Sequence, residues 1–146
     1  MAPKHDSLRE GSRLGLIVAT CIWLWIAVID VVAGEPWRTF TVLGGVVTFT
    51  VAHYLLNFVY GVAIVSAIHG AQREPSLLIG VAFGFLIVEF ALAMVTVLLS
   101  HIGLGELAWV RILGGSVIGA LAAFLVLRRT HPLARELREA ENEEND

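Results

Sequence analysis

Four long apolar runs constrain the fold of this chain more than any other feature of its sequence. They cover residues 14–33, 40–68, 76–100 and 107–127. A helix of about 20 apolar residues is long enough to cross a hydrocarbon layer of about 30 Å. Because the backbone must satisfy its own hydrogen bonds in lipid, each run is predicted to form a transmembrane helix.

The composition excludes a water-soluble domain and a disordered chain. Of the 146 residues, 57% are hydrophobic and 16% are charged, whereas a soluble domain has about 45–50% apolar and about 25% charged residues. The mean hydropathy is +0.78. Too few residues lie outside the four runs to build a large aqueous enzyme domain.

Short connections between the runs predict how the helices are arranged. The breaks contain residues that end or begin helices, such as Pro36 after the first run and Pro75 before the third. Connections this short favour antiparallel neighbours, so we expect an all-α, up-down bundle of four transmembrane helices. The expected organisation is a cytoplasmic N-terminal segment at 1–13, a transmembrane domain at 14–127 and a charged cytoplasmic tail at 128–146.

The distribution of positive charge predicts the orientation of this bundle. Eight of the ten Lys and Arg residues lie on the side of the two termini, and only Arg38 and Arg111 lie on the other. Cytoplasmic segments carry the excess of Lys and Arg, so both termini are predicted to be cytoplasmic. We expect an integral protein of the bacterial inner (cell) membrane. The first run resembles a signal peptide, but its length of about 20 residues exceeds the usual 7–15 and favours an uncleaved span.

A few polar residues lie near the centres of the runs, where they are costly and are functional candidates. His53 and Asn57 are four residues apart in the second run and share one helix face. Glu89 lies at the centre of the third run, at the same depth if the two helices are antiparallel. We predict one buried polar cluster of His53, Asn57 and Glu89. Possible additions to it are Ser116, Tyr60 and Trp23.

Two interpretations of this cluster stay open. Hydrogen bonds between helices fix their register in lipid, and such groups often have no other role. Alternatively, the carboxyl and imidazole groups carry a proton or hold a polar ligand. A second pair, Asp30 and Arg111, lies at similar depth near the outer surface and is predicted to form an ion pair, with solvation at the membrane interface as the alternative.

The sequence contains no catalytic or cofactor motif that we can identify. The single cysteine, Cys21, excludes an intrachain disulfide and a Cys-x-x-Cys redox motif. Only His53 is a central histidine, so haem ligation by two histidines of one chain is not expected, and no Glu-x-x-His pair or zinc spacing occurs. We predict no metal, no cofactor and no nucleic-acid partner.

Small residues recur at every fourth position in all four runs, as in Gly115, Gly119 and Ala123. They favour close helix packing, and the number of such ridges predicts a homo-oligomer or other membrane subunits as partners besides the lipid bilayer. The first functional hypothesis is therefore a non-enzymatic accessory or scaffold subunit of a membrane complex. The alternative is an oligomeric proton-linked transporter or channel that uses Glu89 with His53 and Asn57. A quinone-binding redox subunit is the third possibility.

Overall fold

The computed structural model describes residues 4–71 and 76–130, and all regular secondary structure in this part of the chain is helical. The long helices are α1 (Lys4–Val32), α3 (Val46–Ala71), α4 (Ser76–Leu99) and α5 (Ala108–Thr130). The short elements are α2 (Arg38–Val42), the π-helical turn η1 (Ser100–Leu104) and the 3-10 turn η2 (Gly105–Leu107). The expected all-α architecture is confirmed.

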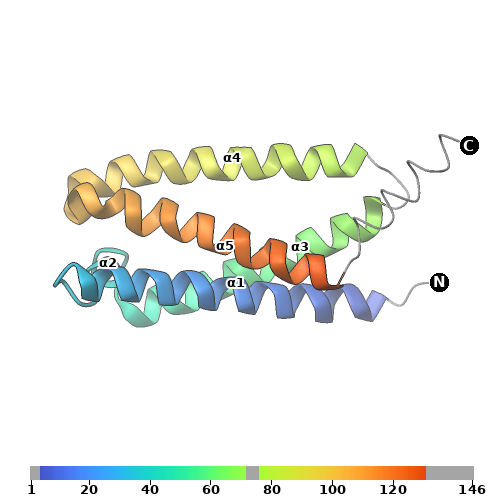
Figure 1. Cartoon of the computed structure of the whole chain (residues 1–146), viewed down its shortest axis with the longest axis horizontal. Helices are drawn as coiled ribbons and strands as arrows, with labels where there is room; N and C mark the ends of the chain where they lie inside the picture. Colours follow the sequence, from blue (N-terminus) through green and yellow to red (C-terminus); the bar gives the residue numbers. More distant parts are fainter. Residues whose placement is uncertain (1–3, 72–75, 131–146) are drawn as a thin grey trace, which may run out of the picture.

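The four long helices run along the length of the molecule, and the short elements gather at one end of it (Figure 1). Helix α1 is the centre of the packing, since it contacts both α3 and α5 extensively. Helix α4 makes fewer contacts, which are shared between α3 and α5. The fold is therefore a tight group of α1, α3 and α5 with a more loosely attached α4.

Three helical stretches are long and apolar enough to cross a membrane: Ser7–Val32, Val46–Gly70 and Ile79–Arg129. The third, of 51 residues, covers most of α4 and α5, with non-helical backbone at Gly103 between them. Many large apolar side chains point outward, as in Leu55, Phe83 and Phe90, which are 62–70% exposed. An apolar outer surface is what a lipid environment favours and water does not, so the structure agrees with membrane insertion.

The second apolar run differs from its prediction as one helix over 40–68. Gly44 and Gly45 have φ of 98° and 97°, which glycine adopts readily and other residues do not. The helix is therefore interrupted, and α3 begins at Val46. The five residues before the break form α2, whose Thr39 and Phe40 are fully buried. This turn brings polar groups of α2 against the end of α1.

Glycines allow α1 to approach its neighbours closely. A Cβ atom built on Gly11, Gly15 or Gly61 would lie within 3.0 Å of backbone atoms of the facing helix, because α1 and α3 nearly touch there. At Gly119 of α5 a Cβ would collide with Ile22 of α1. In contrast, Gly80 of α4 faces open space. Small residues thus replace the hydrophobic driving force that is missing between helices in lipid.

Gly15→Val should destabilise the folded protein in detergent, because its side chain has no room between α1 and α3. Overpacking of this kind costs about 1–3 kcal/mol or more. Gly80→Val is the matched control and should leave the thermal unfolding midpoint nearly unchanged, since that position is open. Equal loss of stability in both variants would contradict the observed α1–α3 packing.

Candidate functional site

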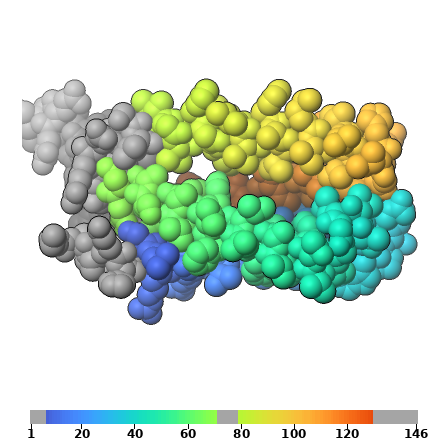
Figure 2. Space-filling model, turned by 180° about the vertical axis from the view of Figure 1, so that it is seen from behind, coloured from blue at the N-terminus to red at the C-terminus, as the bar shows by residue number. Residues whose placement is uncertain are grey.

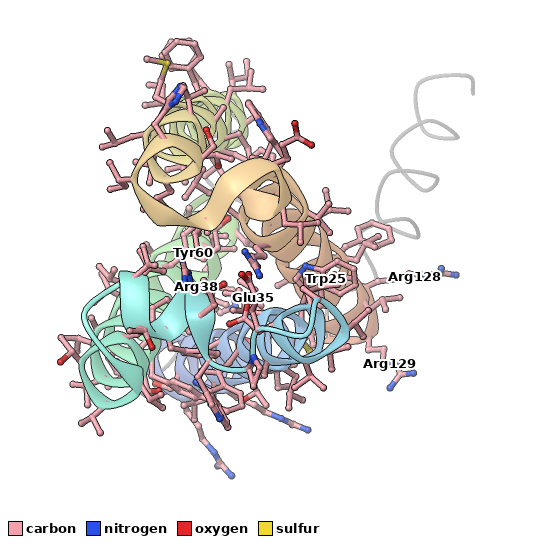
Figure 3. All side chains as sticks on the ribbon, turned by 90° about the vertical axis from the view of Figure 1, so that its left-hand side faces the viewer. Trp25, Glu35, Arg38, Tyr60, Arg128 and Arg129 are labelled. Atoms are coloured by element: carbon pink, nitrogen blue, oxygen red, sulfur yellow. The ribbon has the colours of Figure 1, made fainter. Side chains whose placement is uncertain are left out.

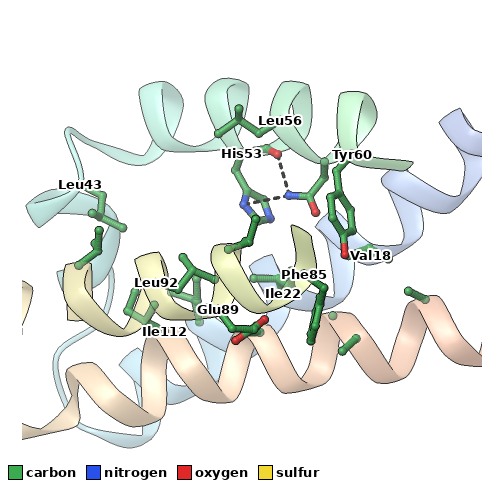
Figure 4. A pocket seen from close by; sticks show the side chains of 18 of the residues that line it. Val18, Ile22, Leu43, His53, Leu56, Tyr60, Phe85, Glu89, Leu92 and Ile112 are labelled. Carbon is green, nitrogen blue, oxygen red and sulfur yellow. Dashed lines mark hydrogen bonds between the residues drawn. The ribbon is translucent and has the colours of Figure 1, made fainter. Parts of the chain in front are cut away.

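A pocket of about 490 Å³ lies between the long helices and is the main candidate site (Figure 4). We call it the central pocket. Side chains of α1, α3, α4 and α5 line it, and most of them are apolar. Five lining residues carry polar side chains, namely His53, Asn57, Tyr60, Glu89 and Ser116. The structure thus brings the predicted polar residues, except Trp23, to one cavity.

The α3 wall of the central pocket carries a hydrogen-bonded His53 and Asn57. The Nε2 atom of His53 lies 3.1 Å from the carbonyl oxygen of Ala19 in α1. A carbonyl only accepts, so Nε2 is the protonated nitrogen. Asn57 Nδ2 donates to the His53 carbonyl at 2.9 Å and lies 3.4 Å from His53 Nδ1. His53 thereby links α1 and α3, and its ring stacks on Phe49 at 5.1 Å between centroids.

The opposite wall carries Glu89 of α4 and Ser116 of α5. The Ser116 hydroxyl donates a hydrogen bond to Glu89 Oε1 and joins the two helices. Within the described residues, no hydrogen bond or ion pair connects Glu89 to His53 or Asn57. The predicted cluster is therefore two hydrogen-bonded pairs that face one cavity. Figure 4 shows His53 and Glu89 extending into this space from α3 and α4.

The two remaining candidates differ in position. Tyr60 lines the central pocket one helical turn beyond Asn57. Trp23 does not line it: its indole Nε1 donates to Thr50 Oγ1 at 3.0 Å, and its ring packs near Trp37 and Phe40. Trp23 thus belongs to the aromatic packing between α1 and the α2 turn.

Asp30 and Arg111 meet in a fully buried ion pair near the end of α1. Arg111 Nε lies 2.9 Å from Asp30 Oδ1, although the direction of this contact is not that of a hydrogen bond. Arg111 also donates to the Leu104 carbonyl and to Glu35 Oε2, each at 3.0 Å. Asp30 accepts from the backbone N–H and the hydroxyl of Thr39 at 2.8 and 2.7 Å. The charges are thereby surrounded by partners.

The polar contacts around Asp30 and Arg111, with Glu35, Arg38 and Thr39, form what we call the outer network. Sequence reasoning did not anticipate the last three as members of it. Arg38 donates two hydrogen bonds to the Gly103 carbonyl, at 2.9 and 3.1 Å, and so joins α2 to η1. Glu35 and Arg38 lie where the helix ends meet, whereas Arg128 and Arg129 point away from the bundle (Figure 3). The sequence feature that could have indicated these residues is the high density of polar side chains at 35–41, at the junction of two apolar runs.

The central pocket offers one carboxyl group, an imidazole, an amide and two hydroxyls, which suit hydrogen bonding and proton exchange. The described residues contain no group of three or more His, Cys, Asp or Glu side chains that could hold a metal ion. Comparisons of the chain with protein-family models, curated proteins and solved structures found no match. A functional conclusion therefore depends on the chemistry of the pocket itself.

Asp30→Asn should lower the free energy of unfolding by about 3–5 kcal/mol, because it leaves the buried Arg111 charge poorly compensated. Combining Asp30→Leu with Arg111→Met should recover much of this loss, since a buried pair can often be exchanged for apolar groups. Arg129→Gln, at an exposed arginine, is the control. Denaturation in detergent micelles measures the free energy of unfolding of the single, double and control variants. An unchanged value for the Asp30→Asn protein would contradict the outer network.

Proposed function

We propose that this chain is an integral membrane protein with four spans and both termini in the cytoplasm. Helices α4 and α5 have 24 and 23 residues, and a helix of 20 residues already extends about 30 Å. The break at Gly103 supports counting them as two spans. In the sequence, eight of the ten Lys and Arg residues belong to the two terminal segments and to the connection between the second and third apolar runs, which supports this orientation in the bacterial inner membrane.

Within that membrane, we propose that the protein is a proton-linked transporter or channel for a small molecule. The observation that carries this proposal is the central pocket, where Glu89 faces the His53–Asn57 pair across an apolar cavity. Ionisable groups at this depth are expensive and mark proton or substrate paths in membrane proteins. The alternative role, fixing helix register, accounts for the Glu89–Ser116 bond but not for a cavity beside it.

The carboxyl of Glu89 would take up and release the proton. Ser116 holds one of its oxygens toward α5, which leaves the second oxygen for exchange with a proton or a ligand. His53, oriented by Ala19 and Asn57, presents its ring on the opposite wall. A proton or polar group that crosses the cavity would thus move between fixed hydrogen-bonding groups in mostly apolar surroundings.

An accessory or scaffold subunit is the second candidate, and the exposure of α4 favours it. Glycines of α4 face open space, and Phe83, Leu86 and Phe90 are 64–70% exposed. This face contacts lipid in a single chain and would be covered in a homo-oligomer or larger membrane complex. Purification in mild detergent distinguishes the two roles, because a scaffold should retain a stoichiometric partner and a transporter should function alone or with copies of itself.

The orientation predicts which positions react with a membrane-impermeant maleimide. In a Cys21→Ser background, a Glu106→Cys protein should be labelled in intact cells, because the proposed orientation places η2 outside the cytoplasm. An Arg129→Cys protein should be labelled only after permeabilisation. The Cys21→Ser protein without a new thiol is the control, and the reverse labelling pattern would contradict the proposed topology.

Proton movement provides the functional test. Glu89→Gln should reduce proton flux driven by a pH gradient in proteoliposomes to the level of protein-free vesicles, because an amide does not exchange a proton. Glu106→Gln makes the same chemical change at an exposed residue outside the pocket and should keep the flux. Unchanged flux in the Glu89→Gln protein would rule out a proton-linked role for this residue.

A further inference from the structure

The central pocket opens sideways, between α3 and α4, at mid-length of the helices. The space-filling view shows a gap between these two helices with α5 visible behind it (Figure 2). Lining residues on both sides of the gap are exposed, among them Leu56 on α3 (69%) and Val88 on α4 (46%). This part of the surface would face lipid, so a ligand would reach the pocket from the bilayer.

The hydrogen-bonding groups in the pocket define which polar group would fit there. Asn57 Nδ2 must face the His53 carbonyl at 2.9 Å, because that oxygen only accepts. The amide orientation is therefore fixed, and Asn57 Oδ1 has no hydrogen-bond partner among the described residues. His53 uses Nε2 for Ala19 and has Nδ1 next to Asn57. The α3 wall thus offers the pocket an acceptor.

The opposite wall adds a second hydrogen-bond acceptor, the Glu89 carboxylate, which also carries a negative charge. Ser116 donates to Glu89 Oε1, and within the described part of the chain Oε2 has no donor. Among the residues at 4–71 and 76–130, no Lys or Arg lines the pocket, so none of these residues places a cation beside the carboxylate. Tyr60 and Phe85 supply aromatic rings to the same cavity, and aromatic faces attract cations. An incoming group should therefore carry a positive charge and N–H donors.

We propose that the central pocket binds a protonated amphipathic amine, which reaches it sideways from the bilayer between α3 and α4. The ammonium group would donate to Glu89 Oε2 and Asn57 Oδ1, and its hydrocarbon part would lie against the apolar walls. A volume of about 490 Å³ suits a molecule of ordinary ligand size. The inference rests on the proposed function in taking this pocket as the transport site, and it names the substrate class.

The hydrogen-bonding groups of the central pocket favour an amine over a quinone as the occupant. A quinone presents carbonyl oxygens, which need donors, whereas Asn57 Oδ1 and an ionised Glu89 are acceptors and Tyr60 supplies a single hydroxyl donor. Glu89 would hold either a proton or the ammonium group, so binding of the amine displaces a proton. The titratable groups that line the pocket are His53, Tyr60 and Glu89, and only the carboxylate among them balances the charge of an ammonium.

Three probes test the substrate class with the full chain in phosphatidylcholine nanodiscs, after subtraction of uptake by empty nanodiscs. Radiolabelled dodecylammonium carries charge and donors, dodecyltrimethylammonium carries charge without donors, and decylubiquinone carries acceptors. We expect saturable binding of dodecylammonium, binding about tenfold weaker for the trimethyl compound, and none of the quinone. Saturable binding of the quinone without that of the amine would overturn the proposal, as would equal binding of the two cations.

Variants then connect binding to the named atoms. Glu89→Gln, which keeps an acceptor for Ser116, should weaken dodecylammonium binding about tenfold or more. Asn57→Leu should weaken it about fivefold, and Glu106→Gln should leave it unchanged. Circular dichroism of each variant excludes unfolding as the cause. Undiminished binding to the Glu89→Gln protein would overturn the assignment.

Access from the bilayer has its own pair of variants. Leu56→Trp narrows the opening and should slow dodecylammonium association several-fold, whereas Leu55→Trp, on the neighbouring exposed position outside the pocket lining, should not. Equal rates in both would overturn sideways access. The flux assay separates failure of the proposed transport function from failure of the proposed substrate class. Proton flux that depends on Glu89, without amine binding, refutes only the substrate class. Amine binding without proton flux refutes only transport.

Discussion

Close packing of α1 against α3 and α5, backbone against backbone in the case of α3, is the constraint on which the rest of this structure depends. In lipid, apolar side chains gain little by leaving the solvent for a neighbouring helix, so association relies on tight contact and on hydrogen bonds. Gly11 and Gly15 let α1 and α3 approach until their backbones nearly touch. His53 adds a hydrogen bond to Ala19 across the same interface. The chain thus has one closely packed pair of helices to which other elements attach.

The central pocket follows from how α4 joins that group. Its contacts with α3 and α5 are sparse, and the bond between Glu89 and Ser116 is the polar link to α5. Loose packing on one side and a fixed α1–α3–α5 group on the other leave a cavity with a sideways opening. A carboxyl group beside such a cavity favours ligand or proton exchange over a purely structural role, which is why we rank transport above the scaffold function that small size alone suggested.

Much of the fold was predictable because a helix that can cross a membrane needs a run of about 20 apolar residues, which is visible in the sequence. The candidate site was predictable in composition, since counting depth along the runs selected His53, Asn57 and Glu89. Its geometry was not: Trp23 belongs to a separate aromatic group, and the polar residues form two pairs rather than one cluster. Side-chain direction around a helix and the distance between helices depend on packing, which periodicity in strongly apolar segments does not encode.

By itself, the sequence determined that the chain is helical and apolar enough for a membrane, because backbone hydrogen bonding in lipid leaves few other solutions. It also limited the polar candidates to a handful of residues. Only the tertiary structure decided that Gly44 and Gly45 interrupt the second run and that Thr39 joins the buried charges of Asp30 and Arg111. It alone decided that Glu89 faces a cavity and not lipid, because that depends on how α4 is rotated against its neighbours.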